Sequence, residues 1–166
     1  MRPAYLRTTN RGLGAGETWP CDYGPELSRS FRALKIWFAF KELGAEKIGK
    51  IVKQNCEQAR FLAQRISREP SLELLAPVSL NIVCFRFRQA GLDAEMLDRL
   101  NADIVADVQS AGIAAPSTTK IQGQLAIRVN ITNHRTRRRD LDVLVDAVLL
   151  KGRERALGRG ATGSAR

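Results

Sequence analysis

The sequence predicts an α+β domain in which helices cover one face of a small, mainly antiparallel sheet. Apolar residues recur at helical spacing in four segments, and four shorter segments have strand character. Their order along the chain is helix, helix, strand, strand, helix, strand, strand, helix, which is typical of an α+β layer. At 166 residues with 44% hydrophobic side chains, the chain is long enough to bury one core.

The first two segments predict an arm followed by a helix. Residues 1–24 are rich in Gly, Thr, Asn and Pro and lack periodicity, so we expect a mobile arm there. From Pro25 a helix is expected, because Pro and Glu suit a first helical turn. Gly44 should end this helix. Its predicted buried stripe consists of Leu27, Phe31, Leu34 and Phe38.

Three further helices follow from the same periodicity. One runs from about Glu46 and ends before Pro70, and one runs from Asp93, as N-cap, to Ser110, with Gly112 as its stop. The last runs from about Thr136 to Leu157 and precedes a tail, residues 158–166, that we expect to be disordered. The predicted inward sets are Ile48, Val52, Cys56, Ala59, Leu62 and Ile66; Met96, Leu97, Leu100, Ile104 and Val108; and Leu141, Leu144, Val145, Val148 and Leu149.

Four short segments predict the strands of the sheet: LELLAP, NIVCFRFR, GIAAPS and QLAIRVNI. In the second, apolar residues surround a partial alternation that would place Arg86 and Arg88 on the solvent side. Pro77 and Ser79 separate the first two strands. No repeat or second core is evident, so we expect residues 25–157 to form one folded body.

Charge and aromatic content raise the question of a polyanionic partner. The formal charge is +10, with a dense run at Arg135, Arg137, Arg138 and Arg139. The first helix also mixes cations with aromatic rings, but its register places most rings on the buried stripe, whereas single-strand binding needs exposed rings. Nucleic-acid binding is therefore not favoured. The alternative that stays open is a stand-alone basic interaction module that binds a polyanion or a partner chain.

A self-contained active site is not evident in the residues. His134 is the single histidine and lies beside the arginine run, so it is either a catalytic base or a turn or cap residue. Cys21, Cys56 and Cys84 lack paired spacing, which predicts reduced, mostly buried thiols and no metal site. The Gly-rich stretch GLGAG lies in the expected arm and does not follow a strand.

The chain shows no signal-peptide pattern and no apolar run of transmembrane length. We therefore expect a cytoplasmic protein without a membrane partner.

Four ordered blocks carry a resemblance to a known family: PAYL, DYGPELSRSFRALKIWF, LNIVCFRFR and LAIRVNITNHRT. Together they resemble the C-terminal part of the group II amino-acid decarboxylases, the pyridoxal-phosphate-dependent family of aromatic-L-amino-acid decarboxylase. The resemblance is collinear over roughly residues 2–157. It implies the end of the large domain followed by the small C-terminal domain of the aspartate-aminotransferase fold, PLP fold type I.

The resemblance also implies roles for two residues in a complete, homodimeric enzyme. Tyr5 of PAYL stands where the family has a tyrosine on a mobile loop, thought to protonate the substrate carbon after decarboxylation. Ser28 stands where better-known members have a glycine whose backbone approaches the phosphate of pyridoxal 5'-phosphate in the neighbouring subunit. At the start of a helix, Ser28 would keep a backbone donor for that phosphate.

The largest departure from the family concerns its reactive lysine, which follows a histidine. None of the seven lysines in this chain follows one, since His134 precedes Arg135. The resemblance implies that the Schiff-base lysine and its partners would lie before Met1. We therefore expect a C-terminal portion of an amino-acid decarboxylase, a carboxy-lyase, that is inactive on its own.

Overall fold

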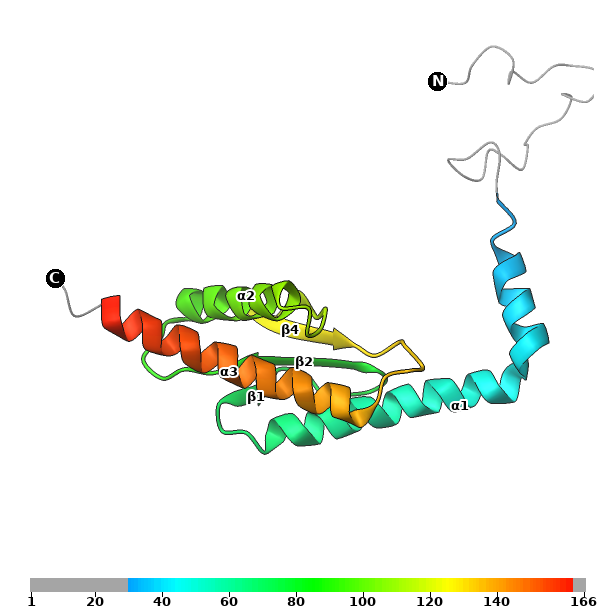
Figure 1. Cartoon of the computed structure of the whole chain (residues 1–166), viewed down its shortest axis with the longest axis horizontal. Helices are drawn as coiled ribbons and strands as arrows, with labels where there is room; N and C mark the ends of the chain where they lie inside the picture. Colours follow the sequence, from blue (N-terminus) through cyan, green and yellow to red (C-terminus); the bar gives the residue numbers. More distant parts are fainter. Residues whose placement is uncertain (1–29, 163–166) are drawn as a thin grey trace, which may run out of the picture. The chain divides into compact units, whose positions relative to one another are not determined.

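The computed structural model describes the backbone of residues 30–162 and the side chains of residues 30–157. The chain divides at Gly44 into two compact units, residues 1–44 and 45–166. In its described part, the larger unit packs a four-stranded sheet and helical segments around one hydrophobic core (Figure 1). The predicted arm, residues 1–24, lies outside the described residues, so its boundary stays a prediction.

Helix α1, Ala33–Ser67, is interrupted at Gly44, where φ is 71° and ψ is 159°. A positive φ is accessible to glycine because it has no Cβ. The predicted break at Gly44 is therefore confirmed, and so is the end of the second helical stretch before Pro70.

The predicted start of the first helix at Pro25 is wrong for the residues that the structure describes. Residues 30–32 are not helical, and α1 begins only at Ala33. The Arg32 N–H donates to the carbonyl oxygen of Ser30 at 2.8 Å. This bond joins residues two apart, whereas the bond of an α-helix joins residues four apart, so the chain makes a tighter turn here.

The predicted burial along α1 is correct only in its last third. Phe31 is 72% exposed and Phe38 57% exposed, although both were expected in a buried stripe. The described part of the smaller unit, residues 30–44, contains one helical segment and no second element to cover it. Val52 is also exposed, whereas Ala59, Leu62 and Ile66 are buried as predicted.

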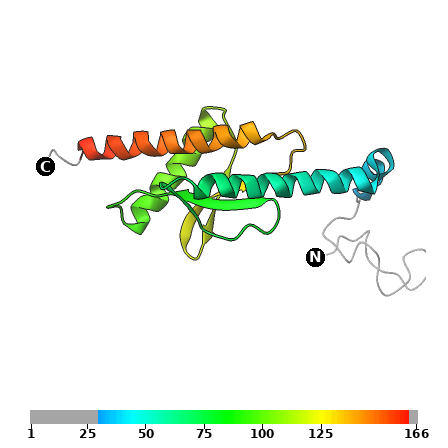
Figure 2. The same ribbon diagram turned by 90° about the horizontal axis from the view of Figure 1, so that it is seen from below.

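The sheet is antiparallel throughout, with strand order β1-β2-β4-β3. Figure 2 shows the same ribbon from below, with residues 82–87 in green and the hairpin of residues 117–130 in yellow. Its strands are β1, Leu72–Leu74; β2, Ile82–Phe87; β3, Ser117–Ile121; and β4, Gln124–Asn130. The register pairs Val83 with Val129 and Phe85 with Ile127, so these buried side chains share the face that meets the core. Glu73 and Arg86 pair on the opposite face, as the alternation predicted for Arg86.

The third predicted strand is displaced. GIAAPS was expected to be extended, but β3 begins at Ser117, its last residue, and the hairpin to β4 turns at Gln122 and Gly123. Proline lacks an N–H for a strand ladder, so Pro116 favours a strand that starts after it. The two hairpin residues have φ values of 49° and 82°, which fit a two-residue hairpin turn.

Helix α2, Ala94–Ser110, has the predicted cap and stop. The Asp93 carboxylate accepts a hydrogen bond from the Met96 N–H at 2.7 Å, and Gly112 follows the helix with a φ of 66°. Leu100, Ile104 and Val108 are buried as expected, but Met96 is exposed because it lies in the first turn, at the edge of the core.

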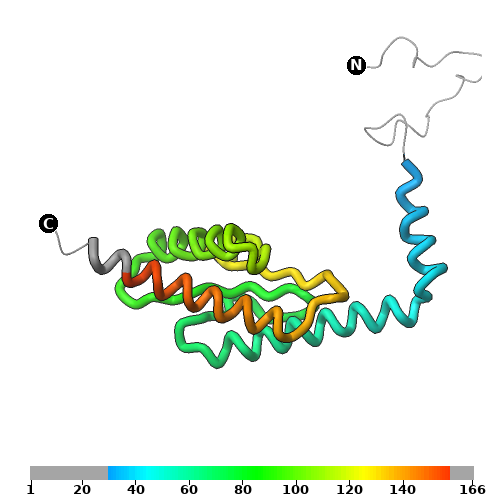
Figure 3. Tube along the Cα trace, in the orientation of Figure 1, coloured from blue at the N-terminus to red at the C-terminus, as the bar shows by residue number. Residues whose placement is uncertain are grey.

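Helix α3, Arg138–Thr162, buries its whole predicted core face: Leu141, Leu144, Val145, Val148 and Leu149. Its backbone continues past Leu157, where the tail was expected, to Thr162. Figure 3 shows α3 following β4 through a short turn. The Arg65 guanidinium of α1 donates to Asp146 of α3 at 3.0 Å, which ties these helices together. The predicted α+β class is confirmed.

Candidate functional site

The two residues expected to act on substrate and cofactor, Tyr5 and Ser28, lie outside the described residues. The nearest described segment starts at Ser30, whose hydroxyl accepts a hydrogen bond from Arg32 Nε at 3.3 Å. Because residues 30–32 are not helical, a helix that began at Ser28 would not be continuous with α1. The first turn of α1 therefore begins at Ala33, and its Leu34 N–H donates to the Phe31 carbonyl oxygen at 3.1 Å.

The structure places His134 in an exposed turn between β4 and α3. Its carbonyl oxygen accepts a hydrogen bond from Gln54 Nε2 at 3.3 Å, and two residues later the Thr136 carbonyl accepts one from Gln58 Nε2 at 2.5 Å. These contacts use the backbone of the turn. His134 was open to two interpretations, a catalytic base or a turn or cap residue, and this geometry favours the turn residue.

The arginine run beside His134 lies on the surface. The Arg138 guanidinium carbon lies 5.2 Å from the centre of the Phe61 ring of α1, a cation–π contact. The Arg135 and Arg137 N–H groups donate to Asn133 Oδ1 and Asp140 Oδ2, each at 2.9 Å. These backbone contacts order the turn before α3. Polyanion binding stays a prediction.

Two cavities open on the larger unit. The first, about 230 Å³, lies between the loop that precedes β3, the end of β4 and the start of α3, with Thr136 and Asp140 among its polar residues. The second, about 590 Å³, lies beside the end of β2 and is lined by Arg86 and Arg88. Glu73 already accepts a hydrogen bond from Arg86 Nε at 3.0 Å and lies 3.8 Å from Arg88 Nε.

Neither cavity fits pyridoxal phosphate as a complete site. Covalent attachment of this cofactor requires a lysine amine, and no lysine lines either cavity. The two arginines that could meet a phosphate in the larger cavity share the Glu73 carboxylate instead. Neither of these two cavities is therefore a cofactor pocket by itself.

Metal ligands and reactive thiols are also not gathered in the described part of the chain. No group of three or more His, Cys, Asp or Glu residues there could hold a metal ion. Cys84 is buried on β2 and Cys56 is half-buried on α1, and both are free thiols, while Cys21 lies outside the described residues. Burial raises the pKa of the Cys84 thiol, with the Arg128 charge opposing this effect.

Two polar side chains with several hydrogen bonds each, Arg155 and Asn101, stabilise the fold. Arg155 of α3 donates to both oxygens of Asp107, at 2.6 and 2.7 Å, and to Asp103 at 2.9 Å, which joins α3 to α2. Asn101 is fully buried and hydrogen-bonds to both the N–H and the carbonyl of Phe87, at 2.7 and 3.0 Å. Sequence reasoning missed these contacts. The available signals were an asparagine on the apolar stripe of α2 and two aspartates one helical turn apart.

A family model for the pyridoxal-dependent decarboxylase conserved domain matches residues 1–88, more than half of the chain. The chain belongs to this family. Two curated relatives are similar to this chain over more residues than the family model matches. It is 29% identical to the aromatic-L-amino-acid decarboxylase of Bacillus atrophaeus over 137 residues, which is 82% of the chain. It is 28% identical to human histidine decarboxylase over 154 residues, or 90% of the chain.

Solved structures of decarboxylases share the fold. The glutamate decarboxylase domain of a diaminobutyrate enzyme from Vibrio parahaemolyticus matches 74% of this chain with a TM-score of 0.66 and 27% identity. Rice TDC, solved with PLP and tryptamine, matches 81% with a TM-score of 0.72 and 19% identity. The second likeness, at its lower identity, concerns the fold alone.

The chain spans only part of these proteins. It covers 28% of the Bacillus relative, 22% of the human relative and 26% of the Vibrio structure. The partial length is consistent with the predicted C-terminal portion of a decarboxylase. None of the helices in residues 30–162 is long and apolar enough to cross a membrane.

Proposed function

We propose that this chain is the C-terminal part of a pyridoxal-phosphate-dependent amino-acid decarboxylase, a carboxy-lyase, and that it acts only together with the part of the fold that holds the cofactor. The observation that carries the proposal is the family match over residues 1–88. The need for a further part follows from the two cavities, which contain no lysine.

Tyr5 is the proposed proton donor of the complete enzyme. Bound pyridoxal phosphate supplies an electron sink that allows the substrate carboxylate to leave as carbon dioxide. The bond between the substrate carbon and the carboxylate breaks, and the Tyr5 hydroxyl donates its proton to that carbon. Water must be excluded during this step so that the proton comes from the phenol. PAYL lies inside the matched segment, which supports this role.

Ser28 is the proposed contact to the cofactor phosphate. Its N–H and its hydroxyl are both donors, and a phosphate oxygen accepts from either. The serine is larger than the glycine found in better-known members, so we expect this contact to depend on where its side chain points. A cytoplasmic, homodimeric enzyme that acts on an amino acid completes the proposal, on the strength of the family alone.

The proton-donor role predicts a specific kinetic change. In a polypeptide that joins this chain to its cofactor-binding part, Tyr5→Phe should lower kcat for carbon dioxide release by about 10²–10⁴-fold and leave KM within a few-fold. Tyr23→Phe is the matched control because Tyr23 is the other tyrosine of the chain. Equal rates for Tyr5→Phe and the parent enzyme would remove the role of Tyr5.

The dependence on a second part predicts the behaviour of the chain alone. Mixed with pyridoxal phosphate and treated with borohydride, the 166-residue chain should acquire no stoichiometric lysine adduct, as measured by intact mass. Scattered, substoichiometric labelling of surface lysines is the expected background. One adduct per chain at a single lysine would show that these residues form a cofactor site by themselves.

A further inference from the structure

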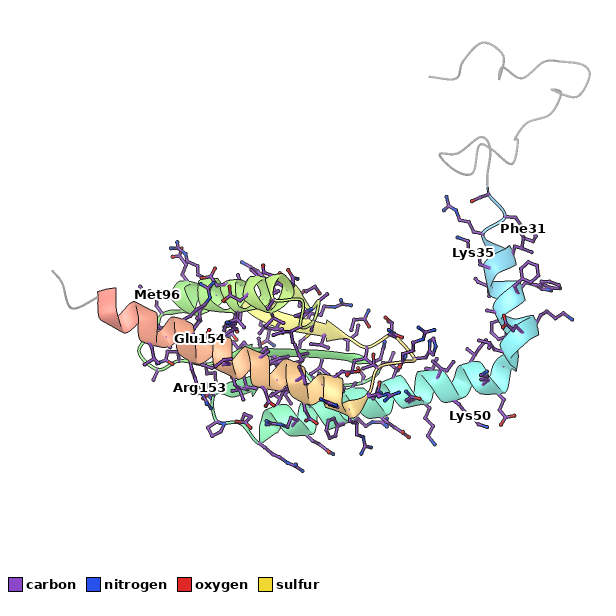
Figure 4. All side chains as sticks on the ribbon, in the orientation of Figure 1. Phe31, Lys35, Lys50, Met96, Arg153 and Glu154 are labelled. Carbon is purple, nitrogen blue, oxygen red and sulfur yellow. The ribbon has the colours of Figure 1, made fainter. Side chains whose placement is uncertain are left out.

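Residues 31–43, which we call the apolar segment, expose more large apolar surface than any stretch of similar length among the described residues. Six side chains in it are between 38% and 72% exposed: Phe31, Leu34, Ile36, Trp37, Phe38 and Phe40. Figure 4 shows the side chains projecting around this part of α1, with Phe31 and Lys35 labelled. Exposed apolar patches of this kind mark interaction sites.

The apolar side chains of the segment lie on opposite sides of its helix. At 100° per residue along the helix that begins at Ala33, Leu34 and Phe38 share one side, and Ile36, Phe40 and Leu43 share the other. The Trp37 ring lies between them and meets Phe38 edge to face at 5.1 Å. An apolar side of a helix needs a neighbour that buries it, so two opposite apolar sides need neighbours on both. The segment therefore fits a pocket with walls on several sides of the helix, which we call the socket, and does not fit a flat surface.

The helix of the segment is also too short to be stable without a partner. It runs from Ala33 to the break at Gly44, fewer than the roughly 12–15 residues at which an isolated helix becomes marginally stable in water. A helix of this length is likewise too short to span a bilayer, which takes about 20 residues. Packing against protein is the remaining source of stability.

The charges in the segment indicate the chemistry of the socket. Lys35 and Lys41 lie among the rings, and neither forms an ion pair with another described residue, although Lys41 Nζ lies 5.6 Å from the centre of the Trp37 ring. A buried ammonium needs an anionic partner. A second copy of the chain would cover only one side of each helix.

We propose that residues 31–43 insert into an apolar socket formed by the part of the decarboxylase fold that these 166 residues do not include, with carboxylates facing Lys35 and Lys41. This inference rests on the proposed function. The solved relative with 27% identity is matched over only 26% of its length, so most of the fold lies outside the match. That part can supply several walls around one helix, which is what two opposite apolar sides require.

Co-expression with a defined probe tests the socket. The probe is the Bacillus atrophaeus decarboxylase from which the segment matched by this chain has been removed, co-expressed with the tagged, full 166-residue chain. We expect the two polypeptides to copurify at equal stoichiometry without added cofactor. The double variants Leu34→Ser/Phe38→Ser and Ile36→Ser/Phe40→Ser, one for each side, should each reduce copurification at least tenfold.

Matched controls and contrary results are available. Val143→Ser/Leu150→Ser changes apolar residues of similar exposure on α3 and should copurify like the parent. Circular dichroism of each variant checks that the larger unit stays folded. The proposal is overturned if the parent does not copurify or if variants on only one side weaken the complex. It is also overturned if sedimentation shows a dimer of the chain that one double variant abolishes.

The same experiment separates this proposal from the proposed function. A stoichiometric complex that releases no carbon dioxide from any amino acid would keep the socket and reject the decarboxylase role. An active complex that tolerates both double variants would keep the role and reject the socket.

Discussion

The apolar segment and the core of the larger unit contain the same kinds of side chain in opposite surroundings. Phe38 is 57% exposed on α1, whereas Phe85 on β2 is fully buried among residues from α1, α2, α3 and the sheet. Both residues lie in local patterns that predict burial. The difference shows that a periodic apolar stripe identifies a face that needs covering, while burial depends on which other elements are present to cover it.

Truncating the two phenylalanines is the strongest test of this contrast. Phe85→Ala should lower the free energy of unfolding of the chain by about 3–5 kcal/mol, because it opens a cavity in a packed core. Phe38→Ala should change it by less than about 0.5 kcal/mol, because the ring is largely in water. Urea unfolding followed by circular dichroism at 222 nm measures both. Similar losses for the two variants would mean that the apolar segment is buried within this chain.

Asn101 extends the contrast from apolar to polar groups in the core. Asn101→Leu should cost about 2–4 kcal/mol, because it leaves the N–H and the carbonyl of Phe87 without their side-chain partner in a buried site. Asn133→Ala, which removes one hydrogen bond in an exposed turn, should cost about 0.5 kcal/mol. Thermal unfolding of both variants gives the comparison. A small loss for Asn101→Leu would show that another group satisfies the Phe87 backbone.

Elements with complete local signals were predictable from the sequence. For α2 the N-cap Asp93, the stop at Gly112 and three buried positions are all as expected, because caps and helical spacing act over a few residues. The start of β3 was missed by five residues, because GIAAPS has strand-like composition but Pro116 cannot join a ladder.

Features that depend on distant segments were not predictable in the same way. The burial of Asn101 depends on the end of β2, and the burial of Asn55 and Gln58 depends on where α1 packs in the larger unit. The predictions for the candidate site had a different origin. Tyr5 and Ser28 came from the family resemblance, since no local spacing marks a phenol or a serine as functional. Their roles stay predictions.

Two helical glycines test the contrast between crowded and open sites with a single methyl group. A Cβ at Gly152 of α3 would overlap the buried ring of Phe87, so Gly152→Ala should cost about 1–3 kcal/mol. Gly49 of α1 has open space at the same position, so Gly49→Ala should stabilise the helix by about 0.5–1 kcal/mol. Opposite signs in urea unfolding are expected. A neutral Gly152→Ala would show that the Phe87 ring can move.

The smallest expected effect concerns the ion pair between α2 and α3, which lies at the rim of the core. The hydrogen bond from Arg155 lowers the pKa of the Asp107 carboxyl below its ordinary value of 3.8. A lowered folded-state pKa stabilises the fold above the unfolded pKa, and the stabilisation is lost as the pH falls through the folded pKa. Because the side chains of Arg155 and Asp107 are 34% and 29% exposed, solvent screening should keep the contribution of this ion pair to the free energy of unfolding at about 1 kcal/mol or less.

Asp107→Asn should therefore be less stable than the parent at pH 6 and closer to it near pH 3, as measured by urea unfolding at both pH values. Glu46→Gln, which alters a largely exposed pair with Lys50, is the control, and its stability should follow that of the parent at both pH values. A constant gap between Asp107→Asn and the parent would show that packing, and not charge, is the contribution of Asp107 to the contact between α2 and α3.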